Sequence, residues 1–271
     1  IDAAVHDLSQ RYTRWVMGNR TLADAALTAV ITDFHQRIAN ERAFAKEDGT
    51  GEIVFSIRDM KQLARFTTQV ENRVGAIIGY LEAARFLYER RFGMRANRDR
   101  VRAHMGTALQ AQGIPIDQRQ IDAILERGIP KQLPHLSAGA ASVDFGYAQL
   151  EVNPDPTPRK YVPTAAAAEL VPVETTLFNV AQLAYAVEMN RPIFLMGETG
   201  VGKTSLIRYL AYLTNNNLRR FNVNEQTEKI ELIGAPQPHY RNGAYVYEWE
   251  DGVLIKAMKE GWWLCLDEMN L

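Results

Sequence analysis

The sequence lacks the features that mark secreted and membrane-bound proteins. It has one cysteine, Cys265, among 271 residues, which excludes an intramolecular disulfide and is typical of a reducing compartment. No apolar run is long enough to cross a bilayer as a helix, and the N-terminus has no basic-then-apolar signal layout. We therefore expect an intracellular protein.

A strong charge of either sign and metal-ligand spacing are absent as well. The formal net charge is −1, so no global field attracts the chain to nucleic acid or to an anionic membrane. The five histidines are scattered without the spacing of a zinc site. With 46% hydrophobic residues and this length, the chain is of ordinary globular composition and has room for one or two domains.

What is present is a phosphate-binding motif at Gly197–Thr204, GETGVGKT, which fits the pattern G-x-x-x-x-G-K-[ST]. The apolar run Ile193–Met196 before it predicts a buried strand, and the residues after it predict a helix. Phosphates would then lie at the positive N-terminus of that helix. The predicted nucleotide-binding residues are consecutive: Gly197, Glu198, Thr199, Gly200, Val201, Gly202, Lys203, Thr204 and Ser205.

A second candidate element lies near the end of the chain. Trp262–Leu266 predicts another apolar strand, and Asp267 and Glu268 follow it directly. An acidic pair at the C-terminal edge of a buried strand can hold hydrated Mg²⁺ and polarise a water molecule. A solvated strand end is the alternative for this pair taken alone. Together with the phosphate loop, the pair predicts a site for a nucleoside triphosphate with Mg²⁺.

Periodicity divides the chain into three parts. Residues 1 to about 110 are predicted to be helical, with Ser56 and Asp59 forming a near match to a capping box before a long helix to Val74. An amphipathic helix is expected at 77–92. Residues 111–165 contain repeated Pro and Gly and predict a connector with one short helix near 117–127.

Residues 166–271 predict an α/β domain. Besides the elements around the two motifs, we expect a helix at 176–188, a strand at 220–224 and a helix at 253–258. The Arg241-Asn242-Gly243 turn signal, between Pro238–Tyr240 and Ala244–Trp249, predicts a hairpin near 236–250.

These residues resemble the AAA+ ATPases, and among them the dynein-related, midasin-like branch. The resemblance covers about residues 165–271 and rests on five blocks: Gly197–Thr204, Asn222–Thr227, Glu231–Gly234, Trp249–Leu254 and Trp263–Leu271. It implies an α/β P-loop NTPase core with ATP and Mg²⁺ as cofactors, and the choice of ATP over GTP comes from it alone. The expected hairpin falls where this branch carries an insertion in its second core helix.

A weaker resemblance concerns the N-terminal part. Phe55–Met60, FSIRDM, is similar to the start of the lid helix that closes an AAA+ module, in which Arg58 would be a phosphate-touching sensor. Residues 1–110 would then be the α-helical lid of a preceding module, and 166–271 would open the next one. A surface arginine near a helix start is the alternative for Arg58.

The same resemblance implies that the core is incomplete. The family's strand order is 5-1-4-3-2, and this sequence supplies strands one to three, so the strand that joins the first to the third is missing. The strand-four sensor, the arginine finger and this module's own lid are also missing. We therefore expect a piece of a longer protein.

The resemblance assigns roles to named residues. Lys203 would neutralise charge on the γ-phosphoryl group, Thr204 would hold Mg²⁺ with Asp267 in its second shell, and Glu268 would orient and deprotonate the attacking water. Neighbouring AAA+ modules, in the same polypeptide or in a ring, would supply an arginine finger. This chain alone would bind ATP and hydrolyse it barely or not at all.

Other functions remain open at this stage. The chain could be a structural module that binds nucleotide without hydrolysis, or a mysterin-like or bacterial chaperone ATPase. It could also be a scaffold that binds acidic partners through a run of basic residues, for which the alternative is a solvated helix face. The run consists of Arg90, Arg91, Arg95, Arg98, Arg100 and Arg102. On the main interpretation the parent remodels a protein or ribonucleoprotein, as in ribosome-precursor maturation. It would act in the cytoplasm, or in the nucleus if it is a true midasin, without membrane or direct nucleic-acid contact.

Overall fold

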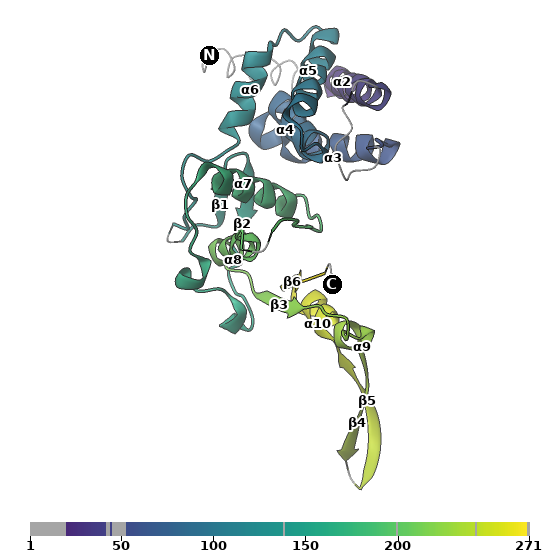
Figure 1. The fold of residues 1–271 in the computed structure, drawn as a ribbon, viewed down its shortest axis with the longest axis vertical. Helices are drawn as coiled ribbons and strands as arrows, with labels where there is room; N and C mark the ends of the chain where they lie inside the picture. The colour runs from purple at the N-terminus through teal and green to yellow at the C-terminus, as the bar shows by residue number, and fades with distance from the viewer. Residues whose placement is uncertain are drawn as a thin grey trace. The chain divides into compact units, whose positions relative to one another are not determined.

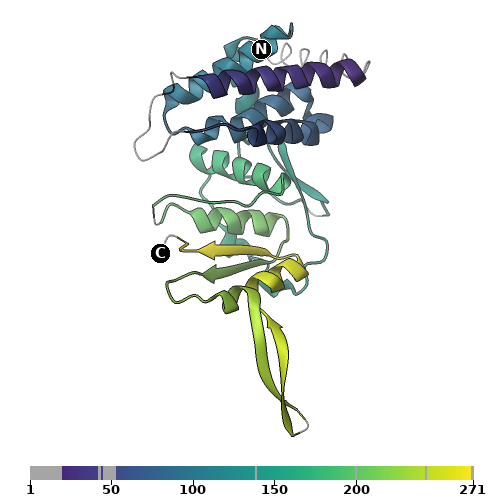
Figure 2. The same cartoon turned by 90° about the vertical axis from the view of Figure 1, so that its right-hand side faces the viewer.

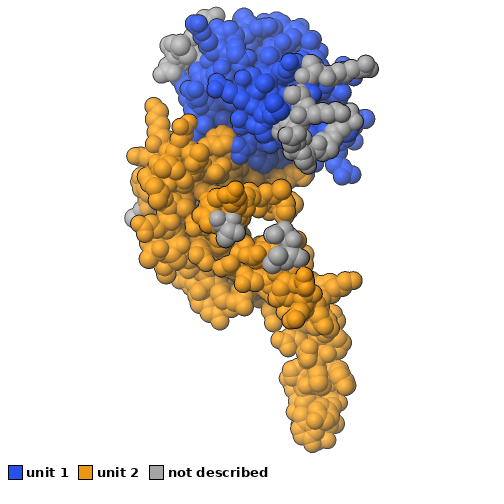
Figure 3. All heavy atoms as spheres, viewed as in Figure 1, with its two compact units in different colours: residues 1–129 blue, residues 130–271 orange. Residues whose placement is uncertain are grey.

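The computed structural model describes residues 20–41, 44, 53–137, 139–198, 200–241 and 243–269. The chain divides into two compact units, residues 1–129 and 130–271, which are coloured separately in Figure 3. Within the described residues, no helix combines the length and the hydropathy needed to cross a membrane.

The first unit is entirely helical where it is described (Figure 1). Its elements are α2 (Arg20–Asn40), α3 (Ile57–Val74), α4 (Ala76–Leu87), the 3-10 turn η1 (Glu89–Arg91), α5 (Arg95–Ala111) and α6 (Gln118–Arg127). The start of α3 is fixed as its sequence predicts, because the Ser56 N–H donates to Asp59 Oδ2 at 2.7 Å and its hydroxyl to the same oxygen at 2.9 Å. Residues 1–19 of the predicted helical region lie outside the described residues.

Helix α4 is the centre of this unit. It was predicted to be amphipathic, and that prediction is wrong: nearly all of its residues are buried, because α3, α5 and α6 pack against it. Gly79 permits the close approach of α3, since a Cβ there would lie 3.0 Å from the Thr67 carbonyl oxygen. Phe34 of α2 completes the core, with its ring 5.0 Å from Tyr88 and 5.8 Å from Tyr80.

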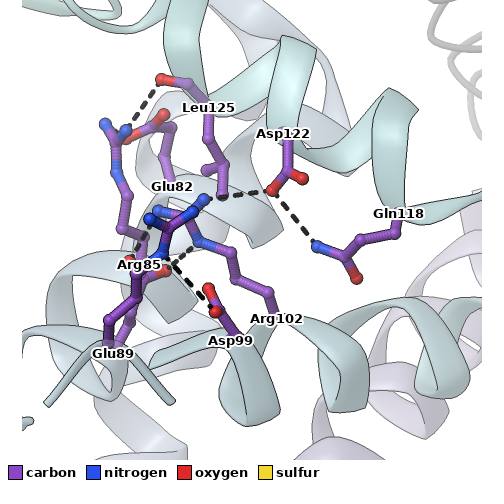
Figure 4. A network of polar contacts seen from close by, with 9 residues as sticks. Glu82, Arg85, Glu89, Asp99, Arg102, Gln118, Asp122 and Leu125 are labelled. Carbon is purple, nitrogen blue, oxygen red and sulfur yellow. Dashed lines mark hydrogen bonds and ion pairs between the residues drawn. The ribbon is translucent and has the colours of Figure 1, made fainter. Parts of the chain in front are cut away.

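A polar network ties the second half of this unit together (Figure 4). Arg102 of α5 binds both carboxylate oxygens of Glu89, at 2.8 and 2.9 Å, and reaches Asp122 of α6 at 3.0 Å. Arg85 of α4 pairs with the buried Glu82 and donates to the Leu125 carbonyl at 2.7 Å. Helix α5, which lies almost entirely within the region predicted to be helical to about residue 110, thus joins α4 to α6. The unit continues to residue 129, beyond the boundary expected at 110.

The second unit begins with a small antiparallel hairpin, β1 (Ser142–Phe145) and β2 (Ala148–Glu151), in a region that was predicted to be a connector. It packs on α7 (Glu174–Glu188), which in turn packs on α8 (Lys203–Leu213). The short turns η2 (Arg159–Tyr161) and η3 (Ala165–Ala168) lie between β2 and α7 in the sequence. The core of this unit is formed by Leu177, Val180, Ala184, Leu206 and Leu210.

Beyond α8 the chain forms one parallel strand pair, β3 (Leu218–Asn222) with β6 (Trp263–Asp267), in which Asn222 lies opposite Asp267. The strand at 262–266 was expected to be buried, but every residue of β6, Cys265 included, is only half-buried. Trp262, expected in the core, is also half-buried; its ring lies 5.1 Å from that of Tyr161 and its Nε1 donates to the Thr157 carbonyl at 3.1 Å.

Between β3 and β6 lie α9 (Lys229–Ile233), the long hairpin β4 (Gly234–Arg241) with β5 (Ala244–Asp251), and α10 (Val253–Glu260). Figure 2 shows the hairpin extending beyond α9 and α10. Its turn residue Asn242 lies outside the described residues. The register places Pro236, Pro238, Tyr240, Tyr245, Tyr247 and Trp249 on one face. The three tyrosines and Trp249 are exposed there.

Candidate nucleotide-binding site

The phosphate-loop segment bends through three glycines with positive φ: Gly197 at 153°, Gly200 at 87° and Gly202 at 83°. Side chains are disfavoured at these backbone angles, which is the local reason for glycine at all three positions. A Cβ on Gly200 or Gly202 would meet no atom within 4 Å, so the backbone angle and not crowding requires glycine. The loop therefore leaves open space beside its backbone.

Lys203 begins α8, with Gly202 in the left-handed conformation as its N-cap. The Lys203 ammonium group donates to the carbonyl oxygens of Gly197 and Glu198, at 2.8 and 2.7 Å. The Lys203 side chain thus extends from the start of α8 back to the loop that precedes the helix. Thr204 and Ser205 follow in the first turn and are half-buried. Thr199 lies outside the described residues.

These features fit a phosphate group. A cation stands at the loop, the first N–H groups of a helix lack intrahelical partners, and the helix dipole adds positive potential at the same end. Glu198 and Val201 are exposed at the loop surface, so neither occupies its interior. The loop can therefore bind an anion through backbone N–H groups and one ammonium group.

The strand predicted before the loop does not form. Residues 193–196 belong to no ladder, and Phe194 and Met196 are 70% and 82% exposed. An apolar run becomes a strand only where another backbone pairs with it, and β3 pairs with β6 alone in the described residues. The prediction from local composition was wrong for this reason.

The acidic pair lies at the end of β6. Asp267 Oδ2 accepts a hydrogen bond from Arg220 Nε of β3 at 2.7 Å, and Arg220 Nη2 lies 2.6 Å from the same oxygen in an ion pair. The Asp267 carbonyl accepts from the Val223 N–H at 2.9 Å, so backbone and side chain are both held. Glu268 is exposed and has a φ of 63°, a left-handed conformation that non-glycine residues rarely adopt. The chain thus turns sharply at the residue expected to activate water.

The two halves of the predicted site are not joined directly. No hydrogen bond or ion pair among the described residues links the loop to Asp267 or Glu268. The partner of Asp267 that is present, Arg220, was not predicted as a site residue. Only the strand register could have indicated this contact. Arg220 lies opposite Cys265, which is two residues before Asp267 on β6, so the side chains of Arg220 and Asp267 are on the same face of the strand pair.

Arg58, the expected sensor, lies in the first unit. It is exposed in the first turn of α3. Its neighbour Asp59 is buried and pairs with Arg91, whose guanidinium carbon lies 4.9 Å from the centre of the Phe55 ring. Burial alone would raise the pKa of Asp59, but hydrogen bonds from Ser56 and Arg91 outweigh it and lower that pKa. The start of α3 is thus rigidly held, and Arg58 projects from a fixed turn.

Part of the expected basic run is ion-paired within the first unit. Arg102 and Arg91 are ion-paired as described, and Arg95 lies 3.8 Å from Asp99. Among the described residues, these pairs interrupt the positive face that an acidic partner would need along this run. The scaffold interpretation stays a hypothesis.

Comparison with known proteins agrees with the loop geometry. The family of AAA domains of the dynein-related subfamily matches residues 192–271. Midasin from Giardia intestinalis is 43% identical over 97 residues, which are 36% of this chain and 2% of that protein. Midasin from Dictyostelium discoideum is 38% identical over the same length, with the same coverage.

An uncharacterized protein from Staphylococcus saprophyticus is 35% identical over 99 residues, which span 36% of this chain and 37% of that protein. The chain thus covers a small part of the midasins and just over a third of the bacterial relative. No solved structure gives a significant match. From the loop geometry and these matches, the chain carries a midasin-like segment of the dynein-related AAA+ family.

Proposed function

We propose that the second unit binds ATP with Mg²⁺ and contributes to its hydrolysis as one module of a larger midasin-like remodelling protein. The observation that carries the proposal is the Lys203 ammonium group held at a loop of positive-φ glycines at the start of α8. AAA+ modules of this family bind nucleotide, and the matched segment includes both the loop and the acidic pair.

Each residue has a defined task on this proposal. The Gly200–Lys203 backbone would hold the phosphates, and the Lys203 ammonium group would move from the loop carbonyls to the outer phosphate oxygens. Thr204 and Asp267 would hold Mg²⁺, which screens phosphate charge when it is bound. Glu268 would accept a proton from the attacking water. Positioning and charge, and not covalent chemistry, would supply the rate.

Hydrolysis on this proposal needs a neighbour. An arginine finger from an adjacent module contributes on the order of 10³-fold or more in comparable NTPases. The chain by itself would therefore bind ATP and release phosphate barely or not at all. The remodelling substrate, protein or ribonucleoprotein, would be chosen by parts of the parent protein outside this segment.

A second candidate is a structural site that keeps nucleotide without hydrolysing it. It is favoured by one observation, namely that Asp267 is bound by Arg220 and no bond among the described residues joins Glu268 to the loop. Glu268→Gln separates the two candidates in a protein that contains the neighbouring modules. Hydrolysis lost with ATP still bound supports the motor, and an unchanged, near-zero rate supports the structural site.

The first test is calorimetric titration of this chain with MgATP and MgGTP, beside Lys203→Ala. Lys229→Ala is the matched control, because Lys229 is also the first residue of a helix, α9. We expect ATP binding that requires Lys203 and not Lys229. Equal binding by the unaltered chain and Lys203→Ala would contradict a working phosphate loop.

A further inference from the structure

Arg220 and Asp267 lie on one face of the parallel pair β3–β6. Asn222 is opposite Asp267 and Arg220 is opposite Cys265, so Arg220 is the diagonal neighbour of Asp267. The hydrogen bond from Nε and the ion-pair contact from Nη2 both end on the same oxygen, Oδ2. The other oxygen, Oδ1, receives only the Glu268 N–H among the described residues, at 3.2 Å.

A purely stabilising role explains this pair poorly. The Arg220 side chain is 45% exposed and that of Asp267 is 22% exposed. Ion pairs in such surroundings contribute only about 0 to 1 kcal/mol to folding. The strand pair is already fixed by its ladder and by the Val223 N–H bond to the Asp267 carbonyl.

What the pair does control is the direction of the carboxylate. A guanidinium group has a fixed planar geometry, so a hydrogen bond and an ion-pair contact to the same oxygen limit the rotation of the Asp267 side chain. With Oδ2 occupied, Oδ1 is the oxygen that remains to accept a hydrogen bond from a water in a magnesium shell. Groups that orient a metal's surroundings in this way commonly change metal affinity by roughly 10- to 100-fold when they are removed.

We propose that Arg220 is a positioning residue that orients Asp267 and thereby sets how strongly Mg²⁺ strengthens nucleotide binding at this site. The inference rests on the proposed function, because it concerns the same magnesium–nucleotide site. Arg220 acts through Asp267 and touches neither the phosphates nor the reacting water.

The neighbouring Arg219 supplies a matched control. It precedes Arg220 on β3 and therefore points to the opposite face of the strand pair. Its guanidinium carbon lies 5.2 Å from the centre of the Tyr161 ring, so Arg219 contacts Tyr161 and not Asp267. Arg219→Gln removes the same charge from the same strand without changing the surroundings of the carboxylate.

The measured quantity is the ratio of the ATP dissociation constant in EDTA to that in excess Mg²⁺. It is determined by calorimetry for the unaltered chain, Arg220→Gln, Arg220→Lys, Arg219→Gln, Asp267→Asn and the double variant Arg220→Gln/Asp267→Asn. Thermal midpoints are recorded for all of them. Lys203→Ala is carried along to identify binding at the phosphate loop.

We expect Arg220→Gln to lower this ratio by about tenfold or more, while the dissociation constant in EDTA and the thermal midpoint change little. Arg220→Lys should recover part of the ratio, because it keeps the charge and loses the planar guanidinium group. The double variant should match Asp267→Asn alone, and Arg219→Gln should match the unaltered chain.

An unchanged ratio for Arg220→Gln would overturn the inference and leave the proposed function standing. Equal weakening with and without Mg²⁺ would also overturn it, because Arg220 would then act on the fold or on the phosphates. If the unaltered chain shows no Lys203-dependent binding, or no effect of Mg²⁺, the proposed magnesium–nucleotide site fails and this inference fails with it.

Discussion

The Lys203 ammonium group donates a 2.8 Å hydrogen bond to the carbonyl oxygen of Gly197, at the opposite end of the phosphate-binding motif. Together with the bond to Glu198, it closes the loop on itself. The closure depends on backbone angles that glycine adopts without strain, because Gly197, Gly200 and Gly202 all have positive φ. The shape of the loop is thus specified by its own sequence.

Gly202→Ala tests this dependence. Its φ is 83°, and an L-residue at such angles costs about 1–2 kcal/mol. We expect nucleotide affinity to fall by about tenfold, the equivalent of that strain, as measured by calorimetry with MgATP. Gly113→Ala is the control, because Gly113 has a similar φ of 76° and a Cβ added there would also meet no atom within 4 Å. It should lose similar stability and keep its nucleotide affinity; equal affinity losses in the two variants would contradict the prediction.

Arg102→Ala tests the polar network of the first unit. The Glu89 side chain is only 4% exposed, so the substitution leaves a buried carboxylate without its bidentate partner. We expect a loss of about 3 kcal/mol in the free energy of unfolding, measured by urea denaturation of the whole chain. Arg95→Ala is the matched control, since Arg95 is 88% exposed and lies 3.8 Å from Asp99. Its effect should stay within about 0.5 kcal/mol, and a comparable loss there would argue against the network.

Glu82 predicts a pH dependence of stability. Burial raises the pKa of Glu82 from 4.5 to about 7, although the Arg85 guanidinium acts in the opposite direction. The native state therefore holds this proton to higher pH than the unfolded chain does. The stability contributed by Glu82 is complete below pH 4.5 and is lost as the pH rises through about 7.

Glu82→Gln removes that titration and keeps the shape of the side chain. Urea unfolding between about pH 5 and 8 should show stability falling less steeply with pH in the variant than in the unaltered chain. Identical slopes for the two proteins would mean that Glu82 does not titrate in this range.

Gly252→Ala tests the base of the long hairpin. A Cβ at Gly252 would lie 2.4 Å from the Leu232 carbonyl carbon and 2.5 Å from its oxygen, so α9 has to move. We expect the α9 amides to lose protection in hydrogen exchange measured by mass spectrometry. Gly261→Ala is the control, with a φ of 68° and no atom within 4 Å of the added Cβ. Unchanged protection of α9 in Gly252→Ala would refute the close packing at this base.

Features that depend on neighbouring residues could be predicted from the sequence. The glycines and the lysine of Gly197–Thr204 specify a loop and a helix start, because backbone angle and helix capping are local properties. The capping box of Ser56 and Asp59 and the hairpin register follow from short-range patterns in the same way.

Features that need a distant partner emerged only when the chain was folded. Residues 193–196 were predicted to be a strand from their composition, yet a strand requires a second backbone, and none pairs with them in the described residues. Helix α4 was predicted to be amphipathic, yet its surroundings bury it on nearly all sides. The contact between Arg220 and Asp267 arises because two strands far apart in the sequence run parallel in one register, which no local pattern encodes.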